Sequence, residues 1–372
     1  MLIGVPKEIK THEYRVGLTP ASVKEVIAHG HRVLVERGAG AGIGATDAEY
    51  LGAGAEVAAC AEEVYARAEM IVKVKEPQPA ERARLRENQI LFAYLHLAPD
   101  PGQARDLMAR GVVAIAYETV TSPGGGLPLL APMSEVAGRM AIQAGARCLE
   151  RENGGMGVLL GGVPGVPAAR ITILGAGVVG TNAAQMAVGT GAQVTVLDLS
   201  VERLRRLEHM LGARVVTCFS NRHNIEEHVL GAELVIGAVL IPGAAAPKLL
   251  PRALVRAMKP GSAIVDVSID QGGCAETSRP TTHAEPTYME EGVVHYCVAN
   301  MPGAVPHTST YALNHATLPF VLALADKGWR RAMEEDPHLR EGLNVCRGRI
   351  THRGVAQALG LPFLEPTRAL AA

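Results

Sequence analysis

The chain has 372 residues, of which 48% are hydrophobic and 20% charged, and its formal net charge is −1 at pH 7. This length suggests two or three domains, and this composition is typical of a globular protein with a large core. The near-zero net charge and the 3% content of aromatic residues argue against binding to nucleic acid or to an anionic membrane.

The cysteine and histidine patterns predict neither a metal site nor a disulfide framework. Six Cys residues are spread widely with no C-x-x-C pair, and the 13 His residues include no H-E-x-x-H spacing. Near the N-terminus, Lys7, Glu8 and Lys10 come too early for the apolar region of a signal peptide. The uncharged stretch 154–169 is rich in Gly and Pro, which disfavours a membrane helix. We therefore expect a cytoplasmic protein with reduced thiols.

The first third of the chain alternates between short apolar strands and helices. Strands are predicted at 1–5, 31–36, 69–75, 89–97 and 112–120, and helices at 19–30, 60–68 and 100–111. The first of these helices has Thr19 as a cap, Pro20 in its first turn and Gly30 at its end. Such alternation predicts a parallel sheet with helices on its faces.

The rest of the chain repeats this alternation after a long helix and a Gly-rich segment. The helix is predicted at 134–152, and the segment 154–167 is interpreted as a turn or hairpin, because it lacks the G-K-[ST] ending of a phosphate loop. Further strands are predicted at 169–175, 193–199, 213–219, 232–240, 262–270 and 293–300. The last fifty or so residues are read as helix-rich, and a helix at 310–325 is a candidate for a second connection between domains.

The predicted fold class is therefore α/β, with two Rossmann-like domains that contain parallel sheets. We expect the C-terminal tail to return to the first domain, which makes that domain discontinuous. The expected first domain comprises residues 1–130 and 306–372, and the expected second domain comprises residues 131–305.

A dinucleotide-binding signal follows the strand at 169–175. The sequence GAGVVG places Gly175, Gly177 and Gly180 in the G-x-G-x-x-G spacing, and Val178 within it is a further expected cofactor contact. These glycines allow a tight turn, a close approach of pyrophosphate to the backbone and close packing of helix on strand. A Gly-rich turn that binds nothing is the alternative.

The acidic residue that this motif requires is present at the end of the next strand. Asp198 would accept hydrogen bonds from the ribose hydroxyls and would repel a 2′-phosphate, which favours NAD over NADP. The nearby Arg203 weakens this preference slightly, because an Arg can accommodate that phosphate.

Polar side chains follow the predicted strands at the edge where α/β sheets bind ligands. They are Arg15, Lys75, His96 and Glu118 in the first domain, and Asp270 and Asn300 in the second. Each has a structural alternative; a lone His at the end of an apolar strand usually makes one satisfied hydrogen bond. Together they suit an amino acid as substrate: a guanidinium can hold a carboxylate, an imidazole can move protons, and a carboxylate can stabilise an ammonium. The set therefore favours oxidative deamination by hydride transfer to NAD. In this interpretation the first domain is the substrate or catalytic domain, the second is the NAD-binding domain, and their two sheet edges are expected to face each other.

The chain resembles the alanine dehydrogenase family over essentially its full length. The motifs that carry the resemblance are IGVPKEIKTHEYRVGLTP, VKVKEP, LFAYLHLA, ITILGAGVVGTNAA, VDVSIDQGGCAETSRPTTH and HYCVANMPGAVPHTSTYALNHATLP. The resemblance implies interconversion of L-alanine, NAD and water with pyruvate, ammonium and NADH, and a homohexamer. It implies that Arg15 and Lys75 bind the substrate and that His96 and Asp270 are catalytic. It also implies cofactor contacts at Ser134, Asp198, Arg203, Ser220, Val239, Leu240, Ile269, Asp270, Asn300 and Met301.

Three other functions are compatible with parts of this pattern. The nearest is the NAD-binding subunit of a proton-translocating transhydrogenase, which shares the fold and opening motif and needs a membrane partner. The combination of Lys75, His96 and Asp270 with ANMPGAVPHTSTYAL argues against it. A saccharopine- or lysine-type dehydrogenase would need a larger substrate site, and a NAD-sensing module would not need the acid–base residues.

Overall fold

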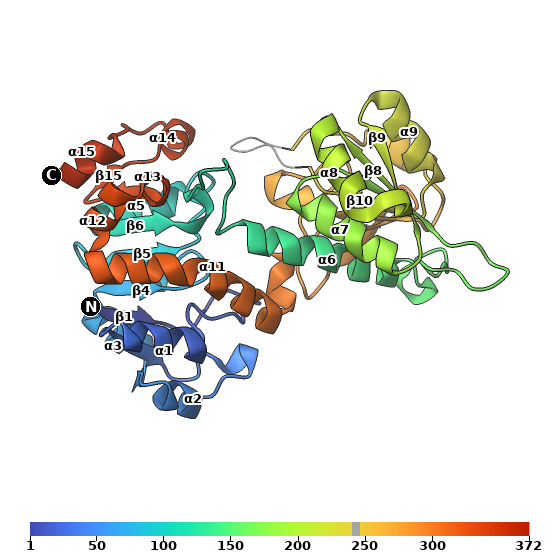
Figure 1. Cartoon of the computed structure of the whole chain (residues 1–372). Coiled ribbons are helices and arrows are strands. Elements are labelled where there is room, and N and C mark those ends of the chain that lie inside the picture. The colour runs from blue at the N-terminus through green and yellow to red at the C-terminus, as the bar shows by residue number, and fades with distance from the viewer. Residues whose placement is uncertain (240–245, 372) are drawn as a thin grey trace. The chain divides into compact units, whose positions relative to one another are not determined.

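The computed structural model describes residues 1–239 and 246–371, which form two compact α/β units (Figure 1). Unit 1 comprises Met1–Met133 and Gly303–Ala372, and unit 2 comprises Ser134–Pro302. No helix in the described part of the chain is long and apolar enough to cross a membrane.

Unit 1 is built on an eight-stranded sheet with the order β15-β14-β6-β5-β4-β1-β2-β3. The strands are β1 (Leu2–Val5), β2 (Arg32–Glu36), β3 (Glu56–Ala58), β4 (Met70–Val72), β5 (Ile90–Ala93), β6 (Val113–Ala116), β14 (Leu343–Cys346) and β15 (Arg349–Ile350). The first six strands pair in parallel, whereas β14 pairs antiparallel with both β6 and β15. The C-terminal tail thus extends the sheet that the N-terminal segment begins.

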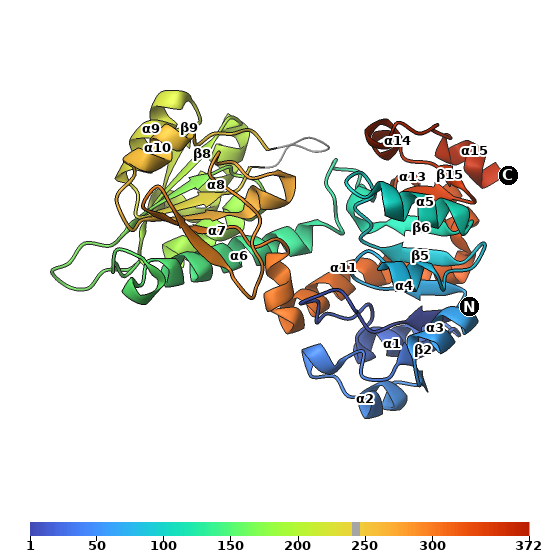
Figure 2. The same cartoon turned by 180° about the vertical axis from the view of Figure 1, so that it is seen from behind.

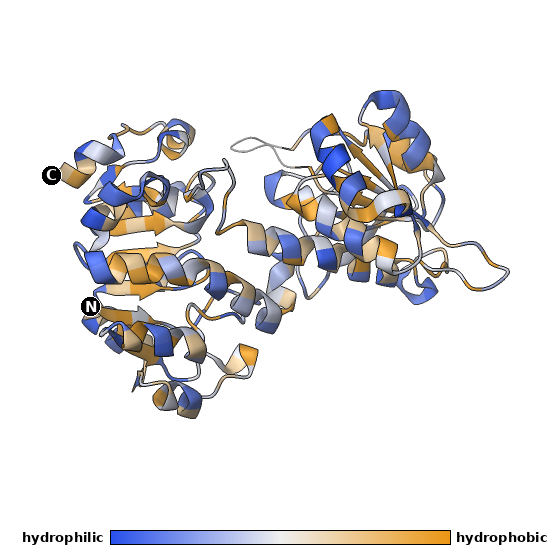
Figure 3. Cartoon of the chain, viewed as in Figure 1, coloured by the Kyte–Doolittle hydropathy of each residue, from blue (hydrophilic) through white to orange (hydrophobic). Residues whose placement is uncertain are grey.

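Helices cover both faces of this sheet (Figures 1 and 2). Helices α3 (Ala61–Arg67), α5 (Pro101–Ala109) and α14 (Arg353–Leu359) share one apolar cluster with the strands, and α1 (Pro20–Ala28) packs with α11 (Pro306–Lys327). The remaining helices are α2 (Asp47–Gly52), α4 (Pro79–Arg82), α12 (Trp329–Glu335), α13 (Pro337–Arg340) and α15 (Pro366–Ala371). Because the sheet is covered on both sides, its central strands are continuous apolar runs, seen as orange arrows in Figure 3.

Unit 2 is built on a seven-stranded sheet with the order β12-β13-β11-β10-β7-β8-β9. The strands are β7 (Arg170–Leu174), β8 (Gln193–Asp198), β9 (Val215–Phe219), β10 (Leu234–Gly237), β11 (Ala263–Asp266), β12 (Thr287–Glu290) and β13 (Val293–Tyr296). All pairs are parallel except β12 with β13. Strand order reverses between β7 and β10, which is the type of switch point where doubly wound sheets bind ligands.

The helices of unit 2 form two apolar clusters with the strands. Helices α6 (Ala131–Cys148), α7 (Val178–Gly189) and α8 (Val201–Leu211) contribute to one cluster, and α9 (Arg222–Gly231) and α10 (Arg252–Ala257) contribute to the other. The small residues of α6 and α7 serve close packing: a Cβ on Gly138 would lie 2.3 Å from the carbonyl oxygen of Val179. The helix expected at 134–152 therefore exists, but it begins earlier and ends at Cys148.

The predicted fold class is confirmed, with three corrections. The sheets are mixed, because β12, β14 and β15 are antiparallel strands that the apolar pattern did not indicate. The tail expected to be helix-rich therefore also contains two strands. The predicted strands were also too long at their C-terminal ends: β5 ends at Ala93 rather than near His96, and β11 ends at Asp266 rather than at Asp270. The chemically interesting residues consequently lie in the loops that follow the strands.

Candidate active site

The Gly-rich loop between β7 and α7 has a geometry that requires glycine at two positions. Gly175 has φ +108°, and a Cβ there would lie 2.5 Å from the carbonyl oxygen of Ala238. A Cβ on Gly180 would lie 1.7 Å from the carbonyl oxygen of Gly175. Gly177, by contrast, is the N-cap of α7, and a Cβ there would meet no heavy atom within 4 Å. The loop is therefore packed tightly on the protein side and open at the start of the helix.

Asp198, at the end of β8, holds this loop by its side chain. One carboxylate oxygen accepts a hydrogen bond from the backbone N–H of Ala176 at 2.6 Å, and the other accepts one from Ser200 at 2.7 Å. The guanidinium of Arg203 lies 3.7 Å away and is exposed. An ionised carboxylate has about four acceptor positions, so Asp198 keeps capacity for hydroxyl donors. Its role is thus structural as well as compatible with ribose binding.

Other residues with predicted cofactor contacts also follow strands of unit 2. Ser220 comes directly after β9, and its N–H donates to the carbonyl oxygen of Asp198 at 3.0 Å. Val239 follows β10, and its carbonyl oxygen accepts a hydrogen bond from the Ser268 hydroxyl at 2.8 Å. Leu240 lies outside the described residues. The carboxyl ends of β8, β9 and β10 therefore contribute three loops to this edge of the sheet, on both sides of the Gly-rich loop that follows β7.

The loop that carries Ile269 and Asp270 is held by a buried carboxylate that the sequence analysis did not single out. Asp266 is fully buried and accepts hydrogen bonds from the N–H groups of Ser268 and Cys274 at 3.1 and 2.7 Å, and from the hydroxyl of Ser278 at 2.6 Å. Asp270 itself is exposed in the 3₁₀ turn Val267–Gln271. The buried acid fixes the turn, and the turn presents the predicted catalytic acid.

The last three predicted cofactor residues lie in two different segments of unit 2: Asn300 and Met301 follow β13, and Ser134 lies in α6. Asn300 has a left-handed backbone with φ +65°, and its carbonyl oxygen accepts a hydrogen bond from His283 at 3.1 Å. Met301 is buried in the core of unit 2. Ser134 lies in the first turns of α6 and is half-buried.

His96 lies in unit 1, in the loop after β5, and its side chain is 44% exposed. Its backbone is left-handed, with φ +48°, a conformation that non-glycine residues seldom adopt. The carboxylate of Glu118 holds this backbone, because it accepts hydrogen bonds from the N–H groups of His96 at 2.6 Å and of Leu95 at 3.2 Å. The imidazole stacks on the ring of Tyr94, with centroids 5.8 Å apart. A left-handed backbone held in this way is compatible with the predicted functional role of His96.

Arg15 differs from the exposed residue that its predicted role suggests. It is 2% exposed, and its guanidinium forms a bidentate pair with Glu13, with Nε–Oε1 and Nη2–Oε2 distances of 2.7 and 2.6 Å. Its Nη1 lies 2.9 Å from the sulfur of Met133. Burial would lower the pKa of Arg15, but the Glu13 carboxylate outweighs this effect and raises it. The guanidinium is therefore a fixed cation with one edge on a carboxylate and another on a thioether.

Lys75 follows β4, and a buried ion-pair network lies beside its backbone. The ammonium of Lys73 is 2.8 Å from Glu8 and 3.2 Å from Glu81, and all three side chains are buried. Glu8 also accepts hydrogen bonds from the N–H groups of Val74 at 2.6 Å and of Lys75 at 3.3 Å. Burial would lower the pKa of Lys73, but the two carboxylates outweigh it and raise this pKa. The network thus fixes the chain at the point where Lys75 emerges.

We expect Lys73→Met to destabilise unit 1 strongly. The substitution leaves the carboxylates of Glu8 and Glu81 buried without their counter-ion, and removal of one partner from a buried pair costs about 3–5 kcal/mol. Lys327→Met is the matched control, because Lys327 pairs with Glu335 at the surface and its loss should change little. Thermal unfolding of both variants provides the measurement. Equal unfolding temperatures for the two variants would contradict the importance assigned to the buried network.

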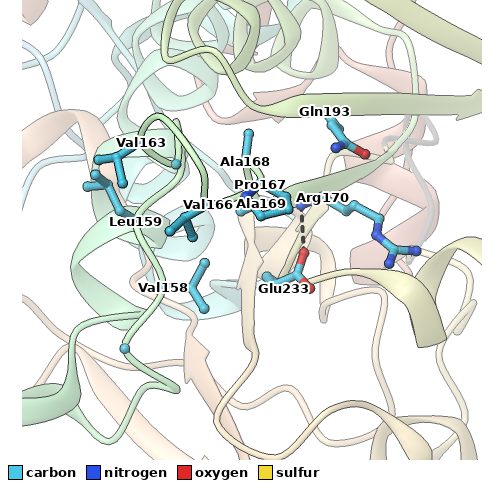
Figure 4. Close-up of a pocket in the computed structure, with 12 residues that line it drawn as sticks. Val158, Leu159, Val163, Val166, Pro167, Ala168, Ala169, Arg170, Gln193 and Glu233 are labelled. Atoms are coloured by element: carbon cyan, nitrogen blue, oxygen red, sulfur yellow. Dashed lines mark hydrogen bonds between the residues drawn. The ribbon is translucent and has the colours of Figure 1, made fainter.

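Two of the pockets in the described part of the molecule differ in their relation to these residues. The larger, about 510 Å³, lies between the segment 157–169 and the starts of β7, β8 and β10, as Figure 4 shows. It is at the edge of the sheet opposite to the Gly-rich loop, and it contains none of the predicted site residues. The smaller, about 320 Å³, lies in unit 1 between residues 7–15 and 38–42. Arg15 and Glu13 contribute to its wall. The smaller pocket is therefore the one connected with the predicted substrate-binding residue.

The residues at the edge of the unit 2 sheet fit a dinucleotide, as judged by the space around them. The open start of α7 offers backbone N–H groups and the positive end of a helix dipole to phosphates, and no Cβ obstructs Gly177. Asp198 is placed beside this helix start. Among residues 1–239 and 246–371, no group of three or more His, Cys, Asp or Glu side chains could hold a metal ion. The Gly-rich loop and Asp198 are the features of a dinucleotide-binding α/β fold.

Comparison with known proteins assigns the chain to a particular family. Residues 4–137 match the model of the alanine dehydrogenase/PNT N-terminal domain, and residues 141–353 match that of the alanine dehydrogenase/PNT C-terminal domain. The chain is 59% identical to an alanine dehydrogenase of Halomonas elongata, over 98% of both chains. It is 55% identical to that of Bacillus subtilis, over 100% of this chain and 98% of the relative. This chain therefore belongs to the alanine dehydrogenase/PNT family.

Two solved structures resemble the fold over nearly the whole chain. An L-alanine dehydrogenase superposes with a TM-score of 0.94 at 55% identity, covering 97% of this chain and 99% of that one. A transhydrogenase from Sinorhizobium meliloti superposes with a TM-score of 0.80 at 25% identity, covering 95% of this chain and 99% of that one. The resemblance to the alanine dehydrogenases is thus much stronger in sequence than the resemblance to the transhydrogenase.

Proposed function

We propose that this protein catalyses the NAD-dependent oxidative deamination of L-alanine to pyruvate and ammonium, and the reverse reductive amination. The observation that carries the proposal is the full-length identity of 52–59% to proteins named alanine dehydrogenase. The presence of His96, Lys75, Arg15 and Asp270 in loops after strands supports it. We assign substrate binding to unit 1 and dinucleotide binding to unit 2.

In this proposal Arg15 and Lys75 hold the alanine carboxylate. The Nε and Nη2 groups of Arg15 are engaged by Glu13, whereas Nη1 faces the thioether of Met133. A thioether is a weak acceptor, so a carboxylate would replace it readily at Nη1. The bidentate pair with Glu13 keeps the guanidinium oriented for that contact. The ammonium of Lys75 supplies a second positive charge to the same carboxylate.

The Gly-rich loop, Asp198 and the adjoining loops hold NAD in the proposal. The cofactor accepts the hydride from the alanine Cα when it is bound. Gly175, Gly177 and Gly180 let the pyrophosphate approach the start of α7, and Asp198 accepts hydrogen bonds from ribose hydroxyls. The remaining contacts are proposed for Ser134, Val178, Arg203, Ser220, Val239, Leu240, Ile269, Asp270, Asn300 and Met301.

His96 and Asp270 form the proposed catalytic pair, one from each unit. Loss of hydride from the amino acid leaves an imine that water must attack. Asp270 orients that water and stabilises positive charge on the nitrogen, while His96 takes a proton from the water and returns one as ammonium leaves. Both residues are exposed on loops that buried or half-buried carboxylates fix in place, those of Glu118 and Asp266.

An assay with a panel of 2-oxo acids tests the proposed function. Purified protein should oxidise NADH in the presence of ammonium and pyruvate, and larger 2-oxo acids such as 2-oxoglutarate should react much more slowly. NADPH should be a poor substitute, because Asp198 disfavours a 2′-phosphate. Hydride transfer that requires both a membrane fraction and NADPH would favour the transhydrogenase alternative. Absence of any pyruvate-dependent turnover would refute the proposal.

The proposal extends to assembly and location. We propose a homo-oligomer, a hexamer by family resemblance, whose mass can be measured by light scattering during size-exclusion chromatography. Small molecules, namely L-alanine, pyruvate and ammonium, are its other proposed partners. A cytoplasmic location fits the six cysteines, all of which are free thiols.

A further inference from the structure

Glu76, directly after Lys75, places a carboxylate between the predicted catalytic imidazole and two lysines. One of its oxygens accepts a hydrogen bond from Lys10. The other, Oε2, lies 3.7 Å from Nδ1 of His96. Oε2 is buried and has no hydrogen-bond partner among the described residues. A buried acceptor without a donor is costly, and the nearest ring nitrogen is the one that can supply this donor with a small rotation.

The charges around Glu76 keep its side chain ionised, and an ionised carboxylate can only accept hydrogen bonds. Burial would raise the pKa of Glu76, but the contact with His96 and the charges of Lys75 and Lys10 outweigh this effect and hold the pKa below its usual range. An ionised carboxylate has no proton to donate, so it is compatible with a hydrogen on Nδ1 of the imidazole and not with a lone pair there. In neutral imidazole, a hydrogen on Nδ1 leaves the lone pair on Nε2.

The remaining contacts of His96 limit the positions that its ring can take. Tyr94 stacks on one face, with an interplanar angle of 27°. Glu118, the other charged group in contact with this loop, binds the backbone N–H of His96 rather than the ring. With the backbone fixed and one face covered, the carboxylate at Nδ1 determines the direction of Nε2.

We propose that Glu76 is a positioning residue, which holds the His96 imidazole by its Nδ1–H group and so presents the Nε2 lone pair to the substrate. This inference rests on the proposed function, because it assigns the proton uptake of that reaction to Nε2 of His96. The VKVKEP segment would then have two roles: Lys75 binds the substrate carboxylate, and Glu76 orients the His96 imidazole. Comparable partners of metal-bound histidines alter activity by about 10- to 100-fold when they are replaced.

Two variants and one spectroscopic measurement test the proposal in the full chain. Protein with ¹⁵N-labelled histidine rings is sedimented and studied by solid-state NMR at a pH where His96 is neutral, and the His96 signal is identified by its loss in His96→Asn. The wild type should have its hydrogen on Nδ1. In Glu76→Gln the amide can donate as well as accept, so a mixture of the two tautomers is expected. The value of kcat should fall about 10- to 100-fold, with KM for alanine and NADH binding nearly unchanged.

A conservative variant and a remote control separate positioning from folding. Glu76→Asp keeps the charge and should restore most of the Nδ1–H population and part of kcat. Glu335→Gln removes an exposed carboxylate of α12 that pairs with Lys327 and Arg331, and it should match the wild type in both readouts.

The wild-type spectrum decides the question even if Glu76→Gln does not fold. A wild-type His96 with its hydrogen on Nε2 would overturn the inference, and so would a folded Glu76→Gln protein with wild-type kcat and an unchanged tautomer. Failure of the proposed function has a different signature, namely wild-type protein that forms no NADH from alanine and NAD. The NMR measurement needs neither substrate nor turnover, so the two outcomes are distinguishable.

Discussion

We expect His96→Asn to lower kcat for alanine oxidation by about 10²- to 10⁴-fold, which is the usual cost of removing a general acid–base group. Asn is preferable to Ala at this position because the backbone of His96 has φ +48°, and Asn adopts the left-handed region more readily than most residues. The hydrogen bond from the backbone N–H to Glu118 should also be retained. The loss should therefore reflect the imidazole and not a refolded loop.

NADH binding by the His96→Asn variant helps to distinguish an acid–base role of His96 from a purely structural one. The dinucleotide residues proposed here lie in unit 2, whereas His96 lies in unit 1, so fluorescence titration of the variant with NADH should give nearly the wild-type Kd. Steady-state kinetics with alanine and NAD provide the rate. A variant with near-normal turnover would reduce His96 to a structural residue that ends a loop and stacks on Tyr94.

The second large effect is expected from Ala substitutions at two glycines of the Gly-rich motif, Gly180 in α7 and Gly177 at its N-cap. Each substitution should impair dinucleotide binding, but for a different reason. Gly180→Ala places a methyl group 1.7 Å from the carbonyl oxygen of Gly175, so α7 must move away from β7. Overpacking of this kind costs about 1–3 kcal/mol or more, and dinucleotide binding should be lost with the displaced helix. Gly177→Ala meets no atom within 4 Å and has an allowed φ of −74°. It should therefore lower the unfolding temperature much less than Gly180→Ala, by no more than the modest cost of Ala at an N-cap position.

Gly177→Ala should nevertheless weaken NADH binding on the order of tenfold, equivalent to about 1.4 kcal/mol, because its methyl group occupies the space through which pyrophosphate approaches the helix start. Gly189→Ala, at the other end of α7, also has open space and serves as the control; it should be neutral or slightly stabilising. Differential scanning calorimetry and NADH titration of the three variants provide the comparison. Tight NADH binding by Gly177→Ala would contradict the role assigned to that position.

Local sequence patterns were sufficient to predict the fold class, because the alternation of strands and helices that defines it is visible in short segments of the chain. Apolar runs between capped helices predicted most of the parallel strands of both sheets, and the Gly175–Gly180 spacing with Asp198 predicted the dinucleotide loop. The antiparallel strands β12 (TYME) and β14 (LNVC) were missed because neither contains a run of more than two apolar residues. Pairing of β14 with β6 is a contact between distant segments, and no local pattern specifies it.

The candidate site could be proposed from the sequence as a set of residues that follow strands, but not as a set of contacts. Arg15, Lys75, His96 and Asp270 could be chosen because strand ends in α/β sheets carry ligand-binding groups. Among the carboxylates that hold them, Glu118 was also chosen from its place after a strand, but its contact with the His96 backbone was not. Glu13, Glu76 and Asp266 were not chosen, because no local pattern distinguishes them from ordinary acidic residues. What distinguishes them is burial and the donors brought to them by other segments. A buried carboxylate needs several donors, and this requirement becomes visible only in three dimensions.

The pairing of β14 with β6 also has a consequence for biosynthesis. Strand β6 is complete once residue 116 has left the ribosome, but its partner begins at Leu343. Translation proceeds at about 5–20 residues per second, so nascent unit 1 waits many seconds with an unpaired edge strand while all of unit 2 is made. An exposed apolar edge of this kind invites pairing with another nascent chain. Premature termination before residue 343 should therefore give aggregates, and chaperone capture of the unfinished chain should be concentrated in this interval.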